Sequence, residues 1–151
     1  MAEHRFSAQL VWTGGPGVDV ASYSRDYEIR TTGKPVIPGS APSVFKGSDA
    51  RHSPEDLILE SLSACHLLTY LSISARAGIK VVSYADTISG TLGMKDGKMR
   101  MVDALLKPVV TIEGADRVAE ALALHEKAHA QCFIAHSVNF PVRNEPVVTA
   151  A

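Results

Sequence analysis

The sequence predicts an α+β fold, and three observations indicate it. The chain has 151 residues, which is the length of one ordinary domain with enough sequence to bury a core. Two stretches, residues 53–78 and 116–133, have the apolar content and spacing of long helices. The segments around them alternate apolar and polar residues or carry tight-turn pairs, as strands of hairpins do. We therefore expect a single domain over residues 1–151.

The N-terminal segment is expected to form a β-hairpin. Residues 5–12 alternate as a half-buried strand does, and residues 13–17 read Thr-Gly-Gly-Pro-Gly, which breaks the pattern. A second strand is expected over residues 18–31. The apolar face of the first strand would hold Phe6, Ala8, Leu10 and Trp12, and one face of the second would hold Tyr23, Arg25, Tyr27 and Ile29. Residues 32–51 hold three prolines and three glycines, so we expect an irregular loop with a short extended piece around Val36.

Residues 53–78 are expected to form one long helix. Ser53 can cap its start, Pro54 suits the first helical position, and Gly78 supplies a stop. Apolar residues between these signals cover most of the helix circumference. A helix of this kind is expected to be buried on all sides.

The rest of the chain is expected to form a hairpin, a second helix and a short strand. Strands over residues 79–94 and 99–113 would be joined by a tight turn at residues 95–98, where Asp96-Gly97 is a preferred turn pair. The helix over residues 116–133 carries an apolar stripe of Val118, Ala121, Leu122, His125, Ala128, His129 and Cys132. Residues 138–142 would close the fold as a strand, and the tail after Pro146 is expected to be frayed.

Composition and charge exclude several classes of function. The net charge of -1 gives no reason to expect nucleic acid or an anionic membrane as a partner. The first twelve residues have no apolar core of a signal peptide, and polar residues interrupt the long helix, so we expect a cytoplasmic protein without a membrane span. In a reducing compartment, two cysteines are more often free, redox-active or metal-bound than joined in a structural disulfide.

The two cysteines are the first candidate site. Cys65 lies in the middle of the first helix, and Cys132 lies at the end of the second. A single cysteine in an apolar helix is most often a small core residue. The two helices are the elements expected to pack together, however, and their packing could bring the two sulfurs within disulfide range.

A second candidate site is a histidine pair on the second helix. His125, Glu126 and His129 match the HExxH pattern, in which two histidines bind zinc and the glutamate acts as a general base. The same residues can equally be packed or hydrogen-bonded histidines. Glu126 points toward the flank of the helix rather than along the stripe of His125 and His129, which argues against the zinc interpretation.

The sequence resembles the OsmC/Ohr family of thiol-dependent peroxidases. The resemblance rests on the run Ser-Pro-Glu-Asp-Leu at residues 53–57, Ser-Ala-Cys at 63–65 and His-Ala-Gln-Cys at 129–132, and on the order of the expected elements. It implies an α+β, OsmC-like fold with antiparallel sheets around two long central helices in an intertwined homodimer. His66 and Phe133 stand where the family often has phenylalanine and proline, which marks a divergent branch.

The resemblance also implies a role for each site residue. Cys65 would be the peroxidatic thiolate, and Cys132 would resolve its sulfenic acid as a disulfide that an external dithiol, lipoyl-type or small, reduces. Glu55 would orient an arginine whose charge stabilises the thiolate; Arg25 is the first choice and Arg51 the alternative. Glu55 and Cys65 are ten positions apart (65 minus 55), about 15 Å in a straight helix. Either the helix breaks near residues 59–61, or an arginine bridges the gap, or the role of Glu55 fails here.

The resemblance implies organic hydroperoxides as substrates and requires no metal and no cofactor. Two other functions remain open from the sequence. One is a zinc-binding hydrolase that uses His125 and His129. The other is a non-catalytic OsmC-like binding protein that keeps the fold without the thiol chemistry.

Overall fold

The chain folds into two compact units, residues 1–57 and residues 58–151. The computed structural model describes residues 2–14 and 19–151. Each unit combines β-strands with helical segments, and α1 starts at the end of the first unit and continues through the second. The predicted α+β class is therefore confirmed, whereas the single domain over residues 1–151 stays a prediction.

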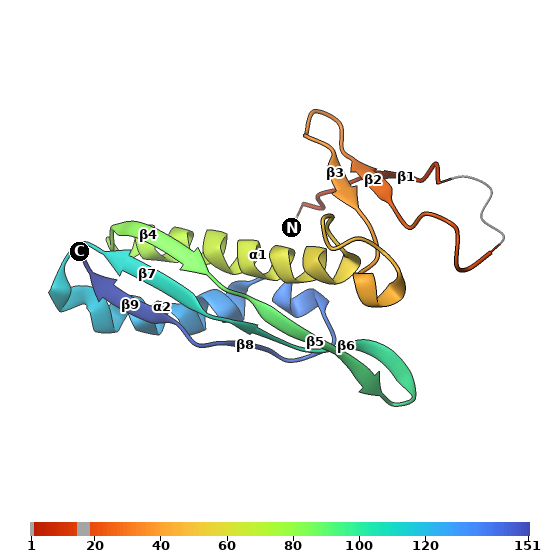
Figure 1. Cartoon of the computed structure of the whole chain (residues 1–151). Helices are drawn as coiled ribbons and strands as arrows, with labels where there is room; N and C mark the ends of the chain where they lie inside the picture. Colours follow the sequence, from red (N-terminus) through yellow and green to blue (C-terminus); the bar gives the residue numbers. More distant parts are fainter. Residues whose placement is uncertain (1, 15–18) are drawn as a thin grey trace. The chain divides into compact units, whose positions relative to one another are not determined.

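The first unit is a small antiparallel sheet followed by a loop. Its strands are β1 (Gln9–Val11), β2 (Tyr27–Arg30) and β3 (Ile37–Gly39), in the order β1-β2-β3 (Figure 1). The predicted hairpin and the extended piece near Val36 are confirmed, and the loop also holds a short 3-10 helix, η1 (Ser43–Phe45). The strands are shorter than expected. Residues 15–18, which include part of the expected break and the start of the second strand, lie outside the described residues.

The apolar face predicted for residues 5–12, which contain β1, is not buried. Phe6 is 93% exposed and Leu10 is 63% exposed, so the prediction of a half-buried strand face is wrong for the single chain. The reason is that only three residues of this strand pair with β2 and no described layer covers their other side. Alternation identified the strand but not what would cover it.

Helix α1 (Pro54–Arg76) begins and ends where the local signals predict. The Ser53 hydroxyl accepts a hydrogen bond from the Asp56 amide at 3.1 Å, and the Asp56 carboxylate accepts one from the Ser53 amide at 2.8 Å, which is a capping box. At the other end Gly78 has φ of 70°, its N–H bonds to the Ala75 carbonyl, and the Ile79 N–H bonds to the Ser74 carbonyl. This is the Schellman arrangement, which glycine favours.

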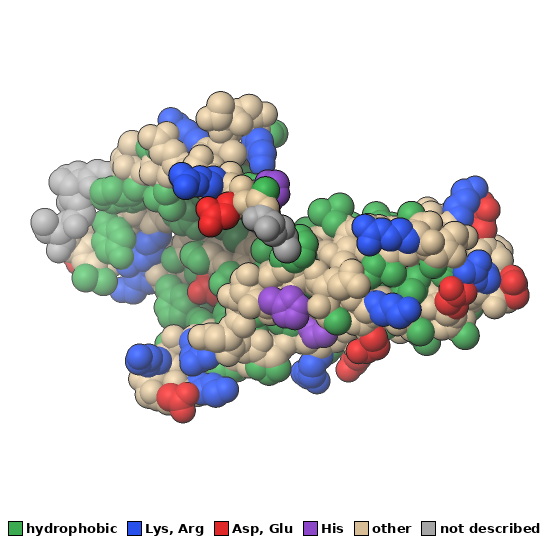
Figure 2. All heavy atoms as spheres, turned by 180° about the vertical axis from the view of Figure 1, so that it is seen from behind, with side chains coloured by type: hydrophobic (Ala, Val, Ile, Leu, Met, Phe, Trp, Pro, Cys, Tyr) green, Lys and Arg blue, Asp and Glu red, His purple; other side chains and the backbone are tan. Residues whose placement is uncertain are grey.

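The burial of α1 differs from the prediction. Its buried residues are Leu62, His66, Tyr70 and Ser74, one in every four positions, so a single stripe faces the interior. Leu68 is 66% exposed on another side, and apolar side chains reach the surface among charged ones (Figure 2). The expectation of burial on all sides is therefore wrong for one chain. Among the described residues α1 is also long and apolar enough to cross a membrane, a test that core helices of soluble proteins pass equally well.

The second unit contains two three-stranded sheets built on one long hairpin. Its arms divide into β4 (Val81–Asp86) and β5 (Ser89–Lys95) on one side, and β6 (Lys98–Leu106) and β7 (Pro108–Ile112) on the other. The sheets are ordered β4-β7-β9 and β5-β6-β8. The predicted turn is confirmed, because Asp96 and Gly97 both have positive φ, as a type I′ turn requires.

The division of each arm into two strands was not predicted, and its cause lies at Pro108. Proline has no N–H to donate to the strand ladder, and the neighbouring Lys107 N–H donates instead to the Asp86 carboxylate at 2.7 Å. The other Asp86 oxygen accepts a hydrogen bond from the Ser63 hydroxyl of α1 at 2.6 Å. The hairpin therefore bends where one aspartate links it to the helix.

The C-terminal part differs most from the prediction. The segment η2 (Ala115–Arg117) leads into α2 (Val118–Gln131), and η3 (Ala135–Ser137) follows it. The closing strand is β8 (Val142–Asn144), not residues 138–142, and the tail forms β9 (Val147–Ala150) instead of fraying. These strands pair in parallel with β6 and β7, so the sheets are antiparallel with one parallel edge each.

Both helices pack on the sheet β4-β7-β9 to form the core of the second unit, and Figure 1 shows them along one side of its strands. The buried apolar side chains of this core are Tyr70, Ile79, Val110, Ile112, Ala121, Leu124, Ala128 and Val148. The α2 stripe is largely as predicted, but Leu124 is buried in place of Leu122, which is 42% exposed. The packing of both helices on this sheet places α1 next to the end of α2.

Candidate active site

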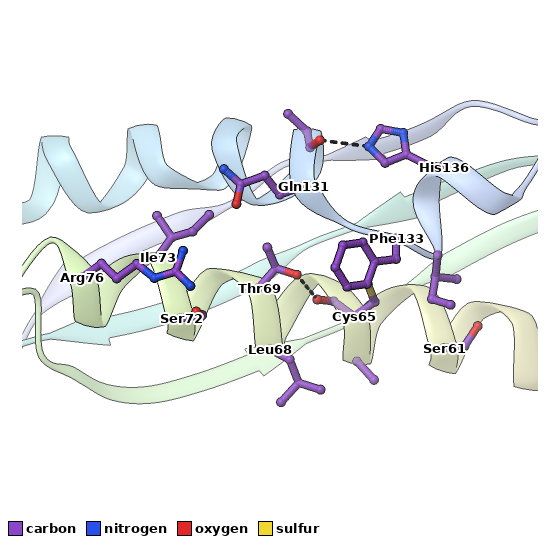
Figure 3. Close-up of a pocket in the computed structure, with 13 residues that line it drawn as sticks. Ser61, Cys65, Leu68, Thr69, Ser72, Ile73, Arg76, Gln131, Phe133 and His136 are labelled. Atoms are coloured by element: carbon purple, nitrogen blue, oxygen red, sulfur yellow. Dashed lines mark hydrogen bonds between the residues drawn. The ribbon is translucent and has the colours of Figure 1, made fainter. Parts of the chain in front are cut away.

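A pocket of about 780 Å³ lies beside Cys65, between α1 and the segment that ends α2. This volume is in the range of small-molecule sites. Figure 3 shows the side chains of α1 along one side and those of residues 130–136 along the other. The α1 residues of the pocket are Ser61, Ala64, Cys65, Leu68, Thr69, Ser72, Ile73 and Arg76, and the opposite side is lined by Ala130, Gln131, Phe133, Ile134 and His136.

The pocket follows one face of α1. Cys65, Leu68, Ser72 and Arg76 succeed one another at spacings of three and four, which places them in a row along the helix. The Thr69 hydroxyl donates to the Cys65 carbonyl at 2.8 Å, so it satisfies a helix carbonyl and leaves the thiol free to face the pocket (Figure 3). Most of the surface of the pocket is apolar, and Cys65 is the one cysteine among its lining residues.

The structure brings Cys65 and Cys132 together. Cys65 is half-buried, Cys132 is 1% exposed, and the Cys65 side chain is a hydrogen-bond partner of the Cys132 thiol. Burial, and then this hydrogen bond, raise the pKa of Cys132 to about 11. At neutral pH Cys132 therefore keeps its proton and can donate it toward Cys65.

Cys132 sits at the C-cap of α2, where the chain turns out of the helix with φ of -75° and ψ of 109°. The amides of Ile134 and Ala135 are hydrogen-bond partners of its sulfur and act to lower its pKa, but burial outweighs them. Two hydrogen bonds hold the segment around Cys132. The His136 backbone N–H donates to the Cys132 carbonyl at 3.2 Å, and the His136 ring Nε2 lies 2.9 Å from the Ala130 carbonyl oxygen. These local hydrogen bonds shape the segment that carries the second thiol, between the pocket residues Gln131 and Phe133.

One histidine of the HExxH pattern, His125, belongs to a core cluster with His66 and Tyr70. His125 is fully buried, its ring stacks on Tyr70 with centroids 4.0 Å apart, and its Nδ1 lies 3.0 Å from Nε2 of His66. His129 is only half-buried. Burial, and then His66, lower the pKa of His125 to about 4, so the ring is neutral. Within residues 2–14 and 19–151 no three His, Cys, Asp or Glu side chains are grouped to hold a metal ion.

The predicted Glu55, Arg25 and Arg51 belong to the first unit, whereas both cysteines belong to the second. Arg25 lies over the Tyr23 ring at 4.2 Å and donates to the Tyr23 and Val20 carbonyls. Arg51 pairs with Asp26 at 3.1 Å. The roles of these three residues beside a thiolate stay predictions.

Glu55 has an unusual environment. Its Oε2 is buried and has no hydrogen-bond partner among the described residues. Burial, and then the charges of Glu55 and Asp56, raise the pKa of Tyr27, which indicates that the tyrosine lies near both carboxylates. Helix α1 is continuous from Pro54 to Arg76, so it has no break near residues 59–61. Of the expected alternatives, a bridging arginine and the failure of the Glu55 role are left open.

Of the residues that line the pocket, Cys65 was predicted as a site residue; Arg76 and Phe133 are among those that were not. Arg76 lies eleven positions after Cys65 (76 minus 65), at a spacing that returns to the same helix face, and this signal could have identified it. Phe133 is 81% exposed and lies in the loop after α2, where no periodicity constrains the direction of a side chain. Figure 3 shows its ring beside Cys65.

Comparison with known proteins agrees with this architecture. Residues 47–145 match the family described as OsmC-like protein. An OsmC-like protein of unknown function from Vibrio cholerae has 32% sequence identity and a TM-score of 0.86, and the match covers 97% of this chain and all of that one, 100%. YmaD, an uncharacterized protein from Bacillus subtilis, is 22% identical over 141 residues, which are 91% of this chain and 89% of that protein.

The fold is shared with a protein named for peroxide resistance. An organic hydroperoxide resistance protein from Elizabethkingia anophelis has a TM-score of 0.70 at 21% identity, and the match covers 99% of this chain and 100% of that one. At this identity the likeness concerns the fold.

Proposed function

The chain belongs to the OsmC/Ohr family, and from this premise we propose that it is a thiol-dependent peroxidase that reduces organic hydroperoxides. Cys65 is the peroxidatic residue and Cys132 the resolving residue. The observation that carries the proposal is the pairing of these two thiols at the edge of an apolar pocket, with Cys65 partly open and Cys132 buried.

The proposed reaction begins with attack of the Cys65 thiolate on the terminal oxygen of the peroxide. An S–O bond forms and the O–O bond breaks; Cys65 becomes a sulfenic acid, and the alkoxide takes up a proton and leaves as an alcohol. The Cys132 thiol then attacks the sulfenic sulfur, so that an S–S bond forms and water leaves. A dithiol supplies two electrons and two protons that restore both thiols.

The buried, protonated state of Cys132 supports this division of roles. A thiol whose pKa is raised to about 11 does not compete with Cys65 for the peroxide at neutral pH. It can instead donate a hydrogen bond to the Cys65 sulfur and hold it at the pocket. Once the sulfenic acid has formed, its electrophilic sulfur is already next to the second thiol.

The pocket supports an alkyl hydroperoxide over hydrogen peroxide as the substrate. Leu68, Ile73, Phe133 and Ile134 offer apolar surface to a carbon chain. Burying apolar area contributes about 25 cal/mol per Å², and hydrogen peroxide has no such area to bury. We therefore expect a higher kcat/KM for organic hydroperoxides.

We further propose that Glu55 and an arginine complete the site in a homodimer. The buried Glu55 oxygen without a partner calls for a donor, and a guanidinium is a suitable one. The exposed apolar residues Phe6 and Leu10 are surface that a second copy of the chain would cover. Arg25 remains the first choice, because its hydrogen bonds to described residues go to the neutral carbonyls of Tyr23 and Val20, whereas Arg51 is already paired with the Asp26 carboxylate. Sedimentation equilibrium tests the dimer, and a monomer at micromolar concentration would contradict it.

The test of the function is turnover of cumene hydroperoxide with a dithiol reductant. Cys65→Ser should lose turnover, while Cys132→Ser should still consume one equivalent of peroxide and then stop. Mass spectrometry after one equivalent should find the Cys65–Cys132 disulfide in the wild-type chain. Unchanged turnover in Cys65→Ser, or no faster alkylation of Cys65 than of a free thiol at neutral pH, would leave a non-catalytic binding protein as the better description.

A further inference from the structure

We propose that His66 and His125 are positioning residues for the resolving step, in which the second thiol attacks the sulfenic sulfur. The hydrogen bond between their rings holds α1 and α2 at the separation at which the Cys132 thiol reaches oxidised Cys65. The inference rests on the proposed function, because it takes the disulfide between the two cysteines as the product of this step. It adds no chemical step and no contact with the substrate.

Side-chain contacts join α1 to α2 in order along the two helices, which run in opposite directions (Figure 1). The Tyr70 hydroxyl of α1 donates to the Ala121 carbonyl of α2 at 3.2 Å. Four positions earlier on α1 (70 minus 66), His66 Nε2 lies 3.0 Å from His125 Nδ1. The residue before His66 is Cys65, the partner of the second thiol. The histidine contact therefore joins the helices one residue from the peroxidatic thiol.

On α2 the histidine shares a stripe with the resolving thiol. His125, Ala128 and Cys132 are all buried, at spacings of three and four, so they follow one another along one face. The helix is continuous from Val118 to Gln131, and Cys132 is its C-cap. A shift or rotation of α2 at His125 is therefore carried along the helix to the point where the second thiol begins.

The histidine pair supplies a defined distance that an apolar contact would not. His66 is 2% exposed and His125 is fully buried, and burial lowers the pKa of both rings. Both rings are therefore neutral at pH 7, and one donates while the other accepts. Nε2 of His125 has no hydrogen-bond partner in the part of the chain that the structure describes. A buried polar atom without a partner costs stability, so this pair is better suited to fixing geometry than to stabilising the core.

The test follows one turnover without reductant and separates peroxide attack from the resolving step. Reduced protein is mixed with increasing amounts of cumene hydroperoxide and quenched in acid. Mass spectrometry then distinguishes the oxygen gained in the sulfenic acid from the hydrogens lost in the disulfide. The rate of disulfide formation rises with peroxide while attack is limiting and reaches a plateau at the rate of the resolving step. The initial slope therefore reports on peroxide attack, and the plateau reports on the approach of the two thiols.

The main variant is His125→Phe, which keeps a ring that can stack on Tyr70 but removes the hydrogen bond to His66. We expect the initial slope to keep its wild-type value and the plateau to fall about tenfold, the upper range for one hydrogen bond. His66→Phe removes the same bond from α1 and should give the same result, so the test does not depend on the folding of one variant. His125→Asn should recover part of the plateau, because its amide can take the place of Nδ1.

A core variant separates positioning from loss of stability. Val148→Ala opens a cavity in the same core, on β9, and leaves the hydrogen bond between the histidines in place, so the plateau should be kept. A wild-type plateau in both phenylalanine variants, no recovery in His125→Asn, or an equal fall in Val148→Ala overturns the inference while the wild type still forms the disulfide. If peroxide produces no disulfide in the wild type, it is the proposed function that is overturned.

Discussion

Acidification from pH 7 to pH 5 is expected to lower the free energy of unfolding by about 2 kcal/mol through His125 alone. The folded pKa of this ring is about 4, against an ordinary value of 6.5, because burial and then His66 disfavour the charged form. The unfolded chain therefore binds a proton at a higher pH than the folded chain does. The stabilisation is fully present above pH 6.5 and is lost as the pH falls from 6.5 toward 4. His66, whose pKa burial also lowers, acts in the same direction.

The measurement is urea unfolding at pH 7 and pH 5 for the wild type and His125→Gln. Glutamine does not titrate and keeps polar atoms that can meet His66. The variant should lose about 2 kcal/mol less than the wild type over this pH interval, whatever its stability at pH 7. The exposed His136 provides the matched control, and His136→Gln should follow the wild type. If the wild type and His125→Gln lose equal stability, the buried neutral histidine is not the source of the acid sensitivity.

Three further predictions concern the fold. Val148→Ala should lower the free energy of unfolding by about 2 kcal/mol, because Val148 is buried in the core, while Val147→Ala, at a position 53% exposed, should change it little in the same urea titration. Gly97→Ala should lower the free energy of unfolding by about 1 kcal/mol in thermal unfolding, because φ at this position is 73°. Gly93→Ala is the control, because an added Cβ there meets only ordinary contacts. An equal loss of stability in both variants would contradict this reason. Ser53→Ala should cost about 1 kcal/mol by loss of the α1 cap, and Ser72→Ala on the exposed side should not.

The parts of the fold that the sequence predicted correctly are those with a local cause. The α1 ends follow from Ser53 and Gly78, and the hairpin turn follows from Asp96-Gly97, because each signal acts on backbone within a few residues. The bend at Pro108 depends on Asp86, which lies on another strand, so no local pattern could predict it. The strand β9 was missed because its pairing with β7 is parallel and distant in sequence.

Some features of the candidate site could also be predicted from the sequence, and others could not. The meeting of Cys65 and Cys132 could be anticipated from two apolar helices that need each other, and the structure places the two thiols together. The burial of α1 could not, because composition shows that a helix is apolar without showing what covers it. His125 was assigned to the apolar stripe correctly, but its contact with His66 joins residues 59 positions apart and was not predictable.

Asp86 has a mechanical consequence for the two thiols. Its carboxylate joins the Ser63 hydroxyl of α1 to the Lys107 amide of the sheet, and Ser63 lies two residues before Cys65. A shift of α1 by one residue, about 1.5 Å, would break this link between the helix and the sheet. We therefore expect the sulfur of Cys65 to stay in place. Cys132 lies at the end of α2 and is followed by a 3-10 turn, so we expect it to be the thiol that moves. We therefore expect disulfide formation to displace residues 132–137 and to leave α1 in place.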